Sequence, residues 1–200
     1  MTKNLISRLI AKIADSICAS ADDLTKLDQA IGDGDHGINM RRGVEALLKQ
    51  GDDISRQDFS TALRKAGTAI VMSVGGASGP LYGSALLAMA KTASSMPSNQ
   101  AEVGVVVAAG IDAVKARGKS DAGAKTMLDV LIPVHREIEN GSSIDRIRRV
   151  AEESATATKP LLAKKGRAAF LGERSIGHID PGAKSAALIV HAVCEVLEKR

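Results

Sequence analysis

Aromatic residues are almost absent from this chain of 200 residues, which contains two Phe, one Tyr and no Trp. Single-stranded nucleic acids bind largely by stacking on aromatic side chains, and the basic residues behind the net charge of +4 are dispersed among acidic ones. We therefore expect no nucleic-acid partner. No apolar run approaches the roughly 20 residues of a membrane span, and the first residues lack the apolar stretch of a signal peptide. We expect no membrane association.

Cysteine is also scarce. Cys18 and Cys194 lie near opposite ends of the chain without metal-like spacing, each beside an apolar helical stripe. This pattern favours buried, reduced thiols and a cytoplasmic location. The length suffices for one domain or at most two small ones, and we expect residues 1–200 to form a single domain.

Apolar residues recur at three- and four-residue steps along most of the chain, which predicts amphipathic helices. No segment alternates as a half-buried strand does. The expected helices cover about 5–17, 21–31, 36–49, a segment from a cap at Asp53 or Ser55 to Gly75, 80–93, a segment from a cap at Ser98 or Asn99 to Gly118, 126–139, 143–165 with an interruption at Pro160, and a last helix whose buried residues lie within 186–197. The predicted fold is all-α, with about eight or nine helices, consecutive ones antiparallel, and three glycine-rich loops gathered at one end.

Three carboxylates, Asp28, Asp33 and Asp35, fall within eight positions and are separated by glycines. Asp28 and Asp33 would point about 140° apart on a continuous helix, so they converge only if the chain leaves the helix between them. Carboxylates about 5 Å apart repel by roughly 3 kcal/mol per pair, which a hard cation between them would relieve. Three carboxylates without a full protein cage suit Mg²⁺, which keeps positions for phosphate oxygens.

An acidic segment of this kind has two other common explanations. An EF-hand is excluded, because counting from Asp33 the twelfth position is Val44 instead of Glu and the sixth is Ile38 instead of Gly. A solvated acidic turn that caps the next helix remains open.

Side chains on the first turn of the next helix, His36 and Asn39, could bond phosphate or ribose oxygens beside that helix's positive end. His36 could also accept a phosphoryl group or simply cap the helix. The segment 75–83 places glycines and Ser78 before a helix, so its backbone amides could approach a phosphate. It is not a Walker A loop, since Pro80 stands where that motif continues. Tight helix crossings would also explain the glycines.

The segment 164–184 is long for a loop inside a compact domain, and such loops are usually functional. Arg167 or Arg174 could pair with phosphate. Asp180, Pro181 and Gly182 could hold a tight turn against a ligand.

With these pieces in this order, the chain resembles the nucleotide-binding L subunit of bacterial dihydroxyacetone kinase. The matching motifs are Leu-Asp-x-x-Ile-Gly-Asp-Gly-Asp-His-Gly-x-Asn-Met, Gly-Gly-Ala-Ser-Gly-Pro-Leu-Tyr-Gly, Lys-Thr-Met-Leu-Asp and Gly-Arg-Ala-Ala-Phe-Leu-Gly-Glu-Arg-Ser-Ile-Gly-His-Ile-Asp-Pro-Gly-Ala. They are collinear and spread over nearly the whole chain. One departure is Ala124, a position that is often acidic in relatives.

The resemblance implies a closed barrel of eight antiparallel helices with the nucleotide, ADP or ATP, at one end. It implies that Asp28, Asp33 and Asp35 hold two Mg²⁺ ions that bridge the phosphates, and that these residues with His36 form the catalytic group. The implied nucleotide contacts are His36, Gly37, Ile38, Asn39, Ala77, Ser78, Gly118, Met127, Arg167, Asp180, Pro181 and Gly182.

The resemblance further implies phosphoryl transfer in one of two modes. In the first, resident ADP accepts phosphate from a phosphohistidine of a phosphotransferase-system protein, and the ATP formed phosphorylates dihydroxyacetone on a separate K subunit. In the second, free ATP is the donor. The segment Asp35-His36-Gly37 favours the first mode, because ATP-dependent relatives more often carry Thr in place of His. The alternatives are an ATP-dependent kinase subunit for dihydroxyacetone or another small ketose, and a nucleotide-loaded regulatory module. A homodimer is compatible with each.

Overall fold

The computed structural model describes residues 2–199, and within this range the chain forms only helices and loops. The helices are α1 (Thr2–Ile31), α2 (His36–Lys49), α3 (Gly51–Ser55), α4 (Phe59–Ser73), α5 (Ser78–Thr92), α6 (Gln100–Gly118), α7 (Leu128–Glu139), α8 (Ile144–Ala157), the 3-10 segment η1 (Arg167–Ser175) and α9 (Pro181–Glu198). The predicted all-α fold is confirmed. No helix in this range combines the length and the apolar character needed to cross a bilayer.

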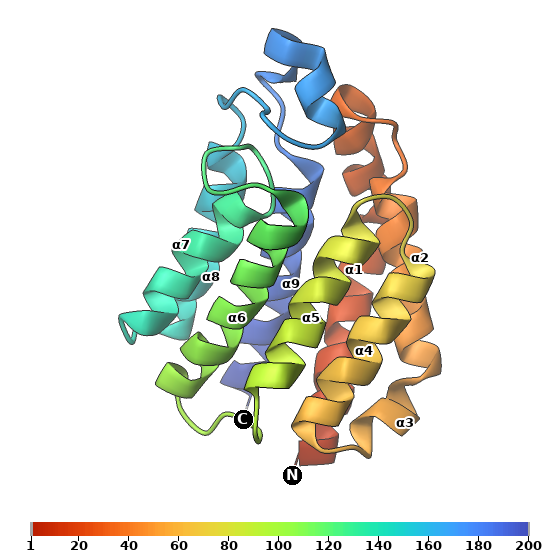
Figure 1. The fold of residues 1–200 in the computed structure, drawn as a ribbon, viewed down its shortest axis with the longest axis vertical. Helices are drawn as coiled ribbons and strands as arrows, with labels where there is room; N and C mark the ends of the chain where they lie inside the picture. Colours follow the sequence, from red (N-terminus) through yellow and green to blue (C-terminus); the bar gives the residue numbers. More distant parts are fainter. Residues whose placement is uncertain (1, 200) are drawn as a thin grey trace.

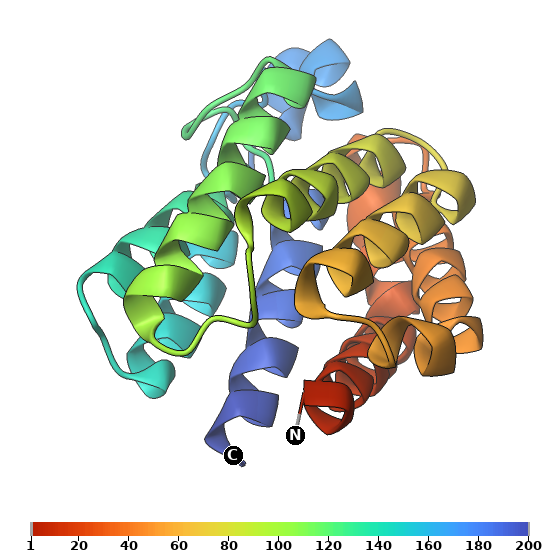
Figure 2. The same ribbon diagram turned by 60° about the horizontal axis from the view of Figure 1, so that its bottom comes forward.

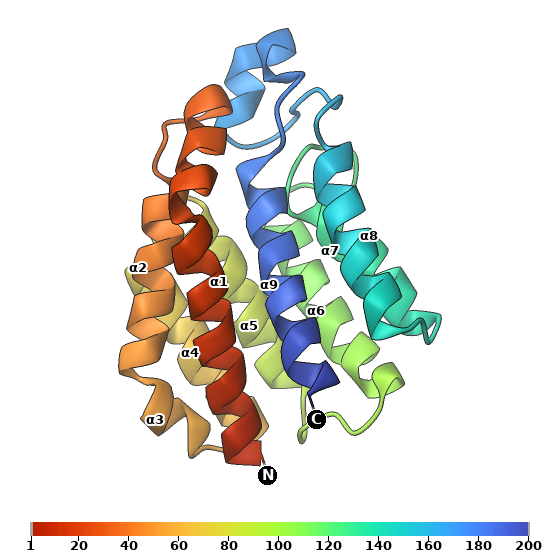
Figure 3. The ribbon, with the colours of Figure 1, turned by 180° about the vertical axis from the view of Figure 1, so that it is seen from behind.

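The long helices alternate in direction and pack in chain order, and α9 packs back on α1, so that the helices form a ring (Figures 1 and 3). The start of α1 and the end of α9 lie at one end of this ring, which comes forward in Figure 2. The opposite end carries the end of α1, η1 and the N-termini of α2, α5, α7 and α9. We call this opposite end the η1 end.

Two apolar clusters form the core. One joins α1 to α4 and includes Ile17, Leu24 and Ile54. The other joins α5 to α9 and includes Leu128 and Val130. Tyr82 packs against both clusters and so links the two halves of the ring.

Three predicted helix boundaries are wrong. The break expected after Ile17 is absent, because the buried stripe continues through Ala21 and Leu24 and keeps α1 continuous. Neither Asp53 nor Ser55 caps α4, because both lie in α3, and the carboxylate of Asp58 accepts the capping bond instead. The eighth helix ends at Ala157, short of the expected end near residue 165.

Both cysteines are free within residues 2–199, as the sequence predicts. Cys194 is buried, and burial raises the pKa of its thiol to about 11. It is therefore a neutral thiol at ordinary pH and behaves as a small apolar core residue.

Candidate functional site

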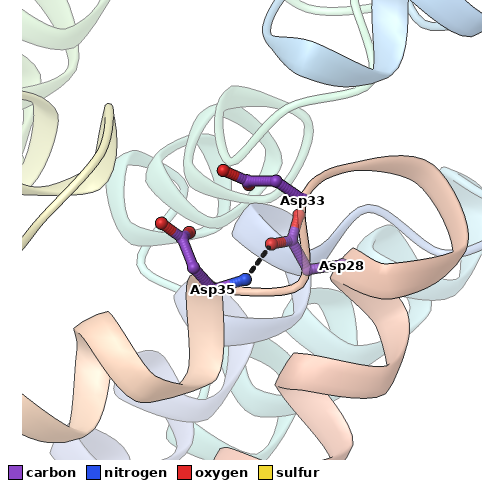
Figure 4. Close-up of side chains that lie close together, drawn as sticks. All are labelled: Asp28, Asp33 and Asp35. Carbon is purple, nitrogen blue, oxygen red and sulfur yellow. Dashed lines mark hydrogen bonds between the residues drawn. The ribbon is translucent and has the colours of Figure 1, made fainter.

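The three carboxylates predicted to converge do meet at the η1 end. Asp28 lies in the last turn of α1, and Asp33 and Asp35 lie in the loop to α2. One oxygen from each lies within 4.8 Å of the others, and the side chains surround one space (Figure 4). The chain leaves the helix after Ile31, and Gly34 adopts a φ of 76° that side-chain-bearing residues rarely take. These two features allow the carboxylates to share one space.

Asp28 also orders the start of α2. Its Oδ2 accepts hydrogen bonds from the backbone N–H of Asp35 at 2.8 Å and of His36 at 3.1 Å. A Cβ at Gly32 would stand 2.1 Å from Asp28 Oδ1, so glycine is needed there. Asp35 is the N-cap residue of α2, yet among residues 2–199 its side chain makes no capping bond to that helix. The capping interpretation therefore accounts for Asp28 but leaves Asp33 and Asp35 unexplained.

Asp33 pairs with a residue far along the chain. Arg167, the first residue of η1, places its guanidinium 3.0 Å from Asp33 Oδ2. The Arg167 side chain is 66% exposed and that of Asp33 is 35% exposed, so this pair contributes little to stability. The main effect of the ion pair is to hold the start of η1 next to the carboxylate cluster.

His36 lies at the centre of a buried hydrogen-bond network. Its Nε2 is 2.9 Å from Ser185 Oγ, and its Nδ1 is 3.1 Å from Ser78 Oγ. Ser185 Oγ also lies 2.9 Å from Tyr82 OH and 3.0 Å from the carbonyl oxygen of Gly182. The network thus joins the N-termini of α2, α5 and α9.

The hydrogen-bond partners of His36 indicate which of its ring nitrogens carries the proton. Ser185 Oγ donates to the Gly182 carbonyl, so it accepts from His36 Nε2–H and from the Tyr82 hydroxyl. His36 Nδ1 then accepts from the Ser78 hydroxyl. Burial lowers the pKa of His36, although the carboxylates of Asp28 and Asp35 oppose this effect. Both observations describe a neutral imidazole with both ring nitrogens occupied.

The glycine-rich loop before α5 lies against the same site. A Cβ at Gly75 would stand 2.6 Å from Asn39 Oδ1, and a Cβ at Gly76 would stand 3.9 Å from Asp35 Oδ1. Gly76 also has a positive φ of 63°. The loop therefore lies close to the carboxylate of Asp35, with Ala77 and Ser78 at the start of α5.

The start of α9 completes the wall. Asp180 caps this helix by accepting a bond from the backbone N–H of Ala183 at 2.7 Å. Burial raises the pKa of Asp180 to about 7. Pro181 and Gly182 form the first turn, and a Cβ at Gly182 would stand 3.7 Å from the backbone nitrogen of Met127. Met127 thus lies beside α9, at the start of α7.

Three further predicted nucleotide contacts, Gly37, Ile38 and Gly118, have different roles in the fold. A Cβ at Gly37 would stand 1.8 Å from the carbonyl oxygen of Ala21, so this glycine is required for α2 to pack on α1. Ile38 is 60% exposed, which leaves it available to a ligand or a partner. Gly118 ends α6 at the η1 end, and its nearest neighbour in another helix is Leu81 of α5.

Sequence reasoning missed three residues that organise the site: Tyr82, Lys125 and Ser185. Each acts through a contact with a distant segment, and no local spacing reveals such a contact. The one available signal was that Tyr82 and Lys125 lie within the motifs that carry the family resemblance.

The fold and the carboxylates define a class: an all-helical ring with a carboxylate cluster at one end. The DAK2 domain matches residues 30–195. The chain is 48% identical over 172 residues to the PEP-dependent dihydroxyacetone kinase 1, ADP-binding subunit DhaL, of Listeria innocua, covering 86% of this chain and 85% of that protein. It is 35% identical to the corresponding DhaL subunit of Escherichia coli, covering 95% of each.

The chain therefore belongs to the DAK2 domain family, among the DhaL subunits of dihydroxyacetone kinases. The native dihydroxyacetone kinase of C. freundii has a similar structure, with a TM-score of 0.78 over 96% of this chain. The identity is 22%, and this chain spans 34% of that one. This likeness supports the fold alone.

Proposed function

We propose that this protein is the nucleotide-binding subunit of a dihydroxyacetone kinase, in which resident Mg-ADP accepts a phosphoryl group from a phosphohistidine protein. The ATP formed then phosphorylates dihydroxyacetone held by a K subunit. The names of the DhaL relatives and their near-complete alignment support this proposal. The observation that carries it is the convergence of Asp28, Asp33 and Asp35 within 4.8 Å.

The donor chemistry fits Mg²⁺. Carboxylate oxygens are hard ligands, and three of them leave coordination positions for phosphate oxygens and water. We propose two Mg²⁺ ions at Asp28, Asp33 and Asp35. When bound, Mg²⁺ would neutralise the phosphate charge during transfer.

The helix ends around the carboxylates suit an anionic ligand. The N-termini of α2, α5, α7 and α9 lie at the η1 end (Figure 1), and helix N-termini offer free N–H groups and a favourable dipole. The backbone of Gly37 to Asn39 and of Ala77 and Ser78 would then hold phosphate and ribose. Gly118 and Met127 would border the base.

The chain's own residues position and enclose the reacting groups. His36 is held neutral, with Nε2–H directed at Ser185 and Nδ1 at Ser78, so it orients the first turns of two helices. We assign it a catalytic role by contact with nucleotide and not as a phosphate carrier. Arg167 and the segment Asp180 to Gly182 would close over the ligand and exclude water, which suppresses hydrolysis of the ATP formed.

A phosphoryl-transfer assay tests the proposal. The protein loaded with Mg-ADP is mixed with a K subunit, dihydroxyacetone and a phosphorylated histidine protein, and dihydroxyacetone phosphate is measured. We expect turnover that needs all components and is not supported by free ATP in place of the phosphoprotein. Turnover with free ATP and no phosphoprotein would favour the ATP-dependent kinase instead.

Two further sequence-based expectations stay predictions. Sedimentation equilibrium would test the homodimer. Cell fractionation would test the cytoplasmic location.

A further inference from the structure

Lys125 is the largest fully buried side chain among the residues that the structure describes, with 1% of its surface exposed. It lies in the turn between α6 and α7 and adopts a φ of 60°, which residues with a side chain seldom take. A buried charge persists only where new partners replace the lost water. The carbonyl oxygens around its Nζ belong to Thr158 at 2.9 Å, Lys159 at 3.3 Å, Leu161 at 3.1 Å and His178 at 2.6 Å.

These four carbonyls come from the two ends of one segment. Three belong to the turn that follows α8, and the fourth lies two residues before Asp180. We call residues 158–178 the site loop and the contact of Lys125 with the four carbonyls the lysine clamp. The site loop includes η1 and carries Arg167 to its partner Asp33. The lysine clamp therefore closes the base of the segment that reaches the carboxylates.

Few apolar contacts hold the site loop. The cluster at its position consists of Ile31, Ala163 and Ala168, with Leu171 packed against it. Four other hydrogen bonds join the two arms of the site loop or tie it to its neighbours. They run from Gly177 N to Lys159 O at 2.8 Å, from Asp180 N to Thr158 Oγ1 at 3.0 Å, from Lys164 N to Ala124 O at 3.1 Å and from Ala163 N to Ser175 Oγ at 3.0 Å. Because this apolar anchor is small, the conformation of the loop depends on the ammonium group. Without that group, all four carbonyls would lose a donor. Thr158 O would keep the N–H of Leu161 and Lys159 O that of Gly177, whereas the ammonium is the donor found for the carbonyls of Leu161 and His178.

We propose that Lys125 is a positioning residue that keeps the site loop closed over Asp28, Asp33 and Asp35 and thereby slows nucleotide release. The nucleotide part rests on the proposed function. The effect of Lys125 on the loop conformation is independent of the proposed function, because it is measured in the protein without nucleotide.

Hydrogen exchange of the nucleotide-free protein tests the effect on the loop. Lys125→Met removes the ammonium and keeps most of the stem. Lys159→Met is the matched control, because it removes an exposed charge from the same loop and leaves the clamp carbonyls in place. We expect exchange in residues 158–178 to rise by about tenfold or more in Lys125→Met, with α4 and α5 unchanged. Lys159→Met should exchange like the parent.

The same variants test the effect on release. Dissociation of labelled Mg-ADP into excess unlabelled nucleotide should be about tenfold faster in Lys125→Met and unchanged in Lys159→Met. Failure of the parent to bind Mg-ADP would overturn the proposed function, whereas the exchange comparison would still decide the role of Lys125 in the loop.

Restoring the ammonium chemically separates positioning from general damage. Lys125→Cys is made in a Cys18→Ala, Cys194→Ala background, unfolded, alkylated with 2-bromoethylamine and refolded. Alkylation with 2-bromoethanol instead gives a neutral side chain of the same length that still donates one hydrogen bond. This hydroxyethylated protein replaces Lys125→Met in the comparison if that variant fails to fold.

We expect the aminoethylated protein to exchange and to release ADP like the background protein, and the hydroxyethylated protein to be faster in both. Three results would overturn the proposal. The first is loop exchange that is unchanged without the ammonium. The second is an equal rise in α4 and α5, which indicates general destabilisation. The third is identical behaviour of the two alkylated proteins.

Discussion

Arg167 and Asp33 form an ion pair of 3.0 Å that connects the site loop to the carboxylate cluster. In the proposed function Asp33 is a metal ligand, so Mg²⁺ and Arg167 compete for the same carboxylate. Release of Arg167 from Asp33 would leave its guanidinium free to pair with a phosphate. The pair is thus a contact that ligand binding can exchange at small cost, because both side chains are partly exposed.

The first prediction concerns Asp33→Asn. It removes one ligand charge from a partly exposed position, so the free energy of unfolding should change by less than about 1 kcal/mol. Retention of Mg-ADP should be lost, because the cluster would hold two carboxylates instead of three. Thermal unfolding and calorimetric titration with ADP in Mg²⁺ measure the two effects. An Asp33→Asn protein that retains ADP as tightly as the parent would rule out the metal assignment.

The second prediction is that His36 carries no phosphate. Its two ring nitrogens are engaged by Ser185 and Ser78, so neither is free to attack a phosphoryl donor. The apoprotein is incubated with a phosphorylated histidine donor, and its intact mass is measured at mildly alkaline pH. We expect no added phosphate. An adduct that disappears in His36→Ala would reverse this assignment.

The third prediction is energetic coupling between Tyr82 and Ser185. Ser185→Ala leaves the partly buried Tyr82 hydroxyl and the buried His36 Nε2–H without their acceptor, which should cost about 1–3 kcal/mol of stability. In a Tyr82→Phe background, Ser185→Ala should lower the stability by a smaller amount, because the Tyr82 hydroxyl is no longer there to lose its acceptor. Urea unfolding of the two single variants and the double variant gives the coupling, which we expect near 1 kcal/mol. Strictly additive losses would refute the hydrogen bond.

The contrast between these sites shows what the sequence could predict. The starts of α6 and α8 follow from local N-capping by Asn99 and Ser143, and the sequence predicts a helix start near each of them. The carboxylates were found because they lie within eight positions around glycines that break the helix. The bond between His36 and Ser185 joins residues 149 positions apart, and only the closure of the ring, in which α9 packs on α1, brings them together.

The buried Lys125 was missed for the same reason. A lysine in a loop is usually solvated, and its partners are backbone carbonyls, which any sequence supplies. Only the folded arrangement of α7, α8 and the site loop reveals the lysine clamp. The predicted break in α1 failed for a different reason, since polar residues near Ser20 interrupt the pattern only on the exposed side of a continuous helix.

The fourth prediction concerns pH and Asp180 in protein free of nucleotide and Mg²⁺. Burial raises the pKa of the Asp180 carboxyl to about 7 in the folded state, from an ordinary value of 3.8. Between these values the folded state binds more protons than the unfolded state, so this group lowers stability as the pH rises through that window. Asn at this position keeps the capping acceptor but does not titrate.

The stability of the parent relative to Asp180→Asn should therefore decrease between pH 4 and pH 8, by an amount on the order of a few kcal/mol. Urea unfolding of both proteins at a series of pH values measures the difference, and the titrations that the two proteins share cancel. Parallel pH profiles would show that Asp180 ionises normally.

The central claim is that ADP is a resident cofactor held through Mg²⁺ by Asp28, Asp33 and Asp35. Native mass spectrometry of protein purified without added nucleotide tests this claim most directly, with Asp33→Asn and a chelator-treated sample as controls. We expect the parent to carry the mass of one ADP with Mg²⁺, and both controls to lack it. A parent that is free of nucleotide, or an Asp33→Asn protein that keeps it, would contradict the claim.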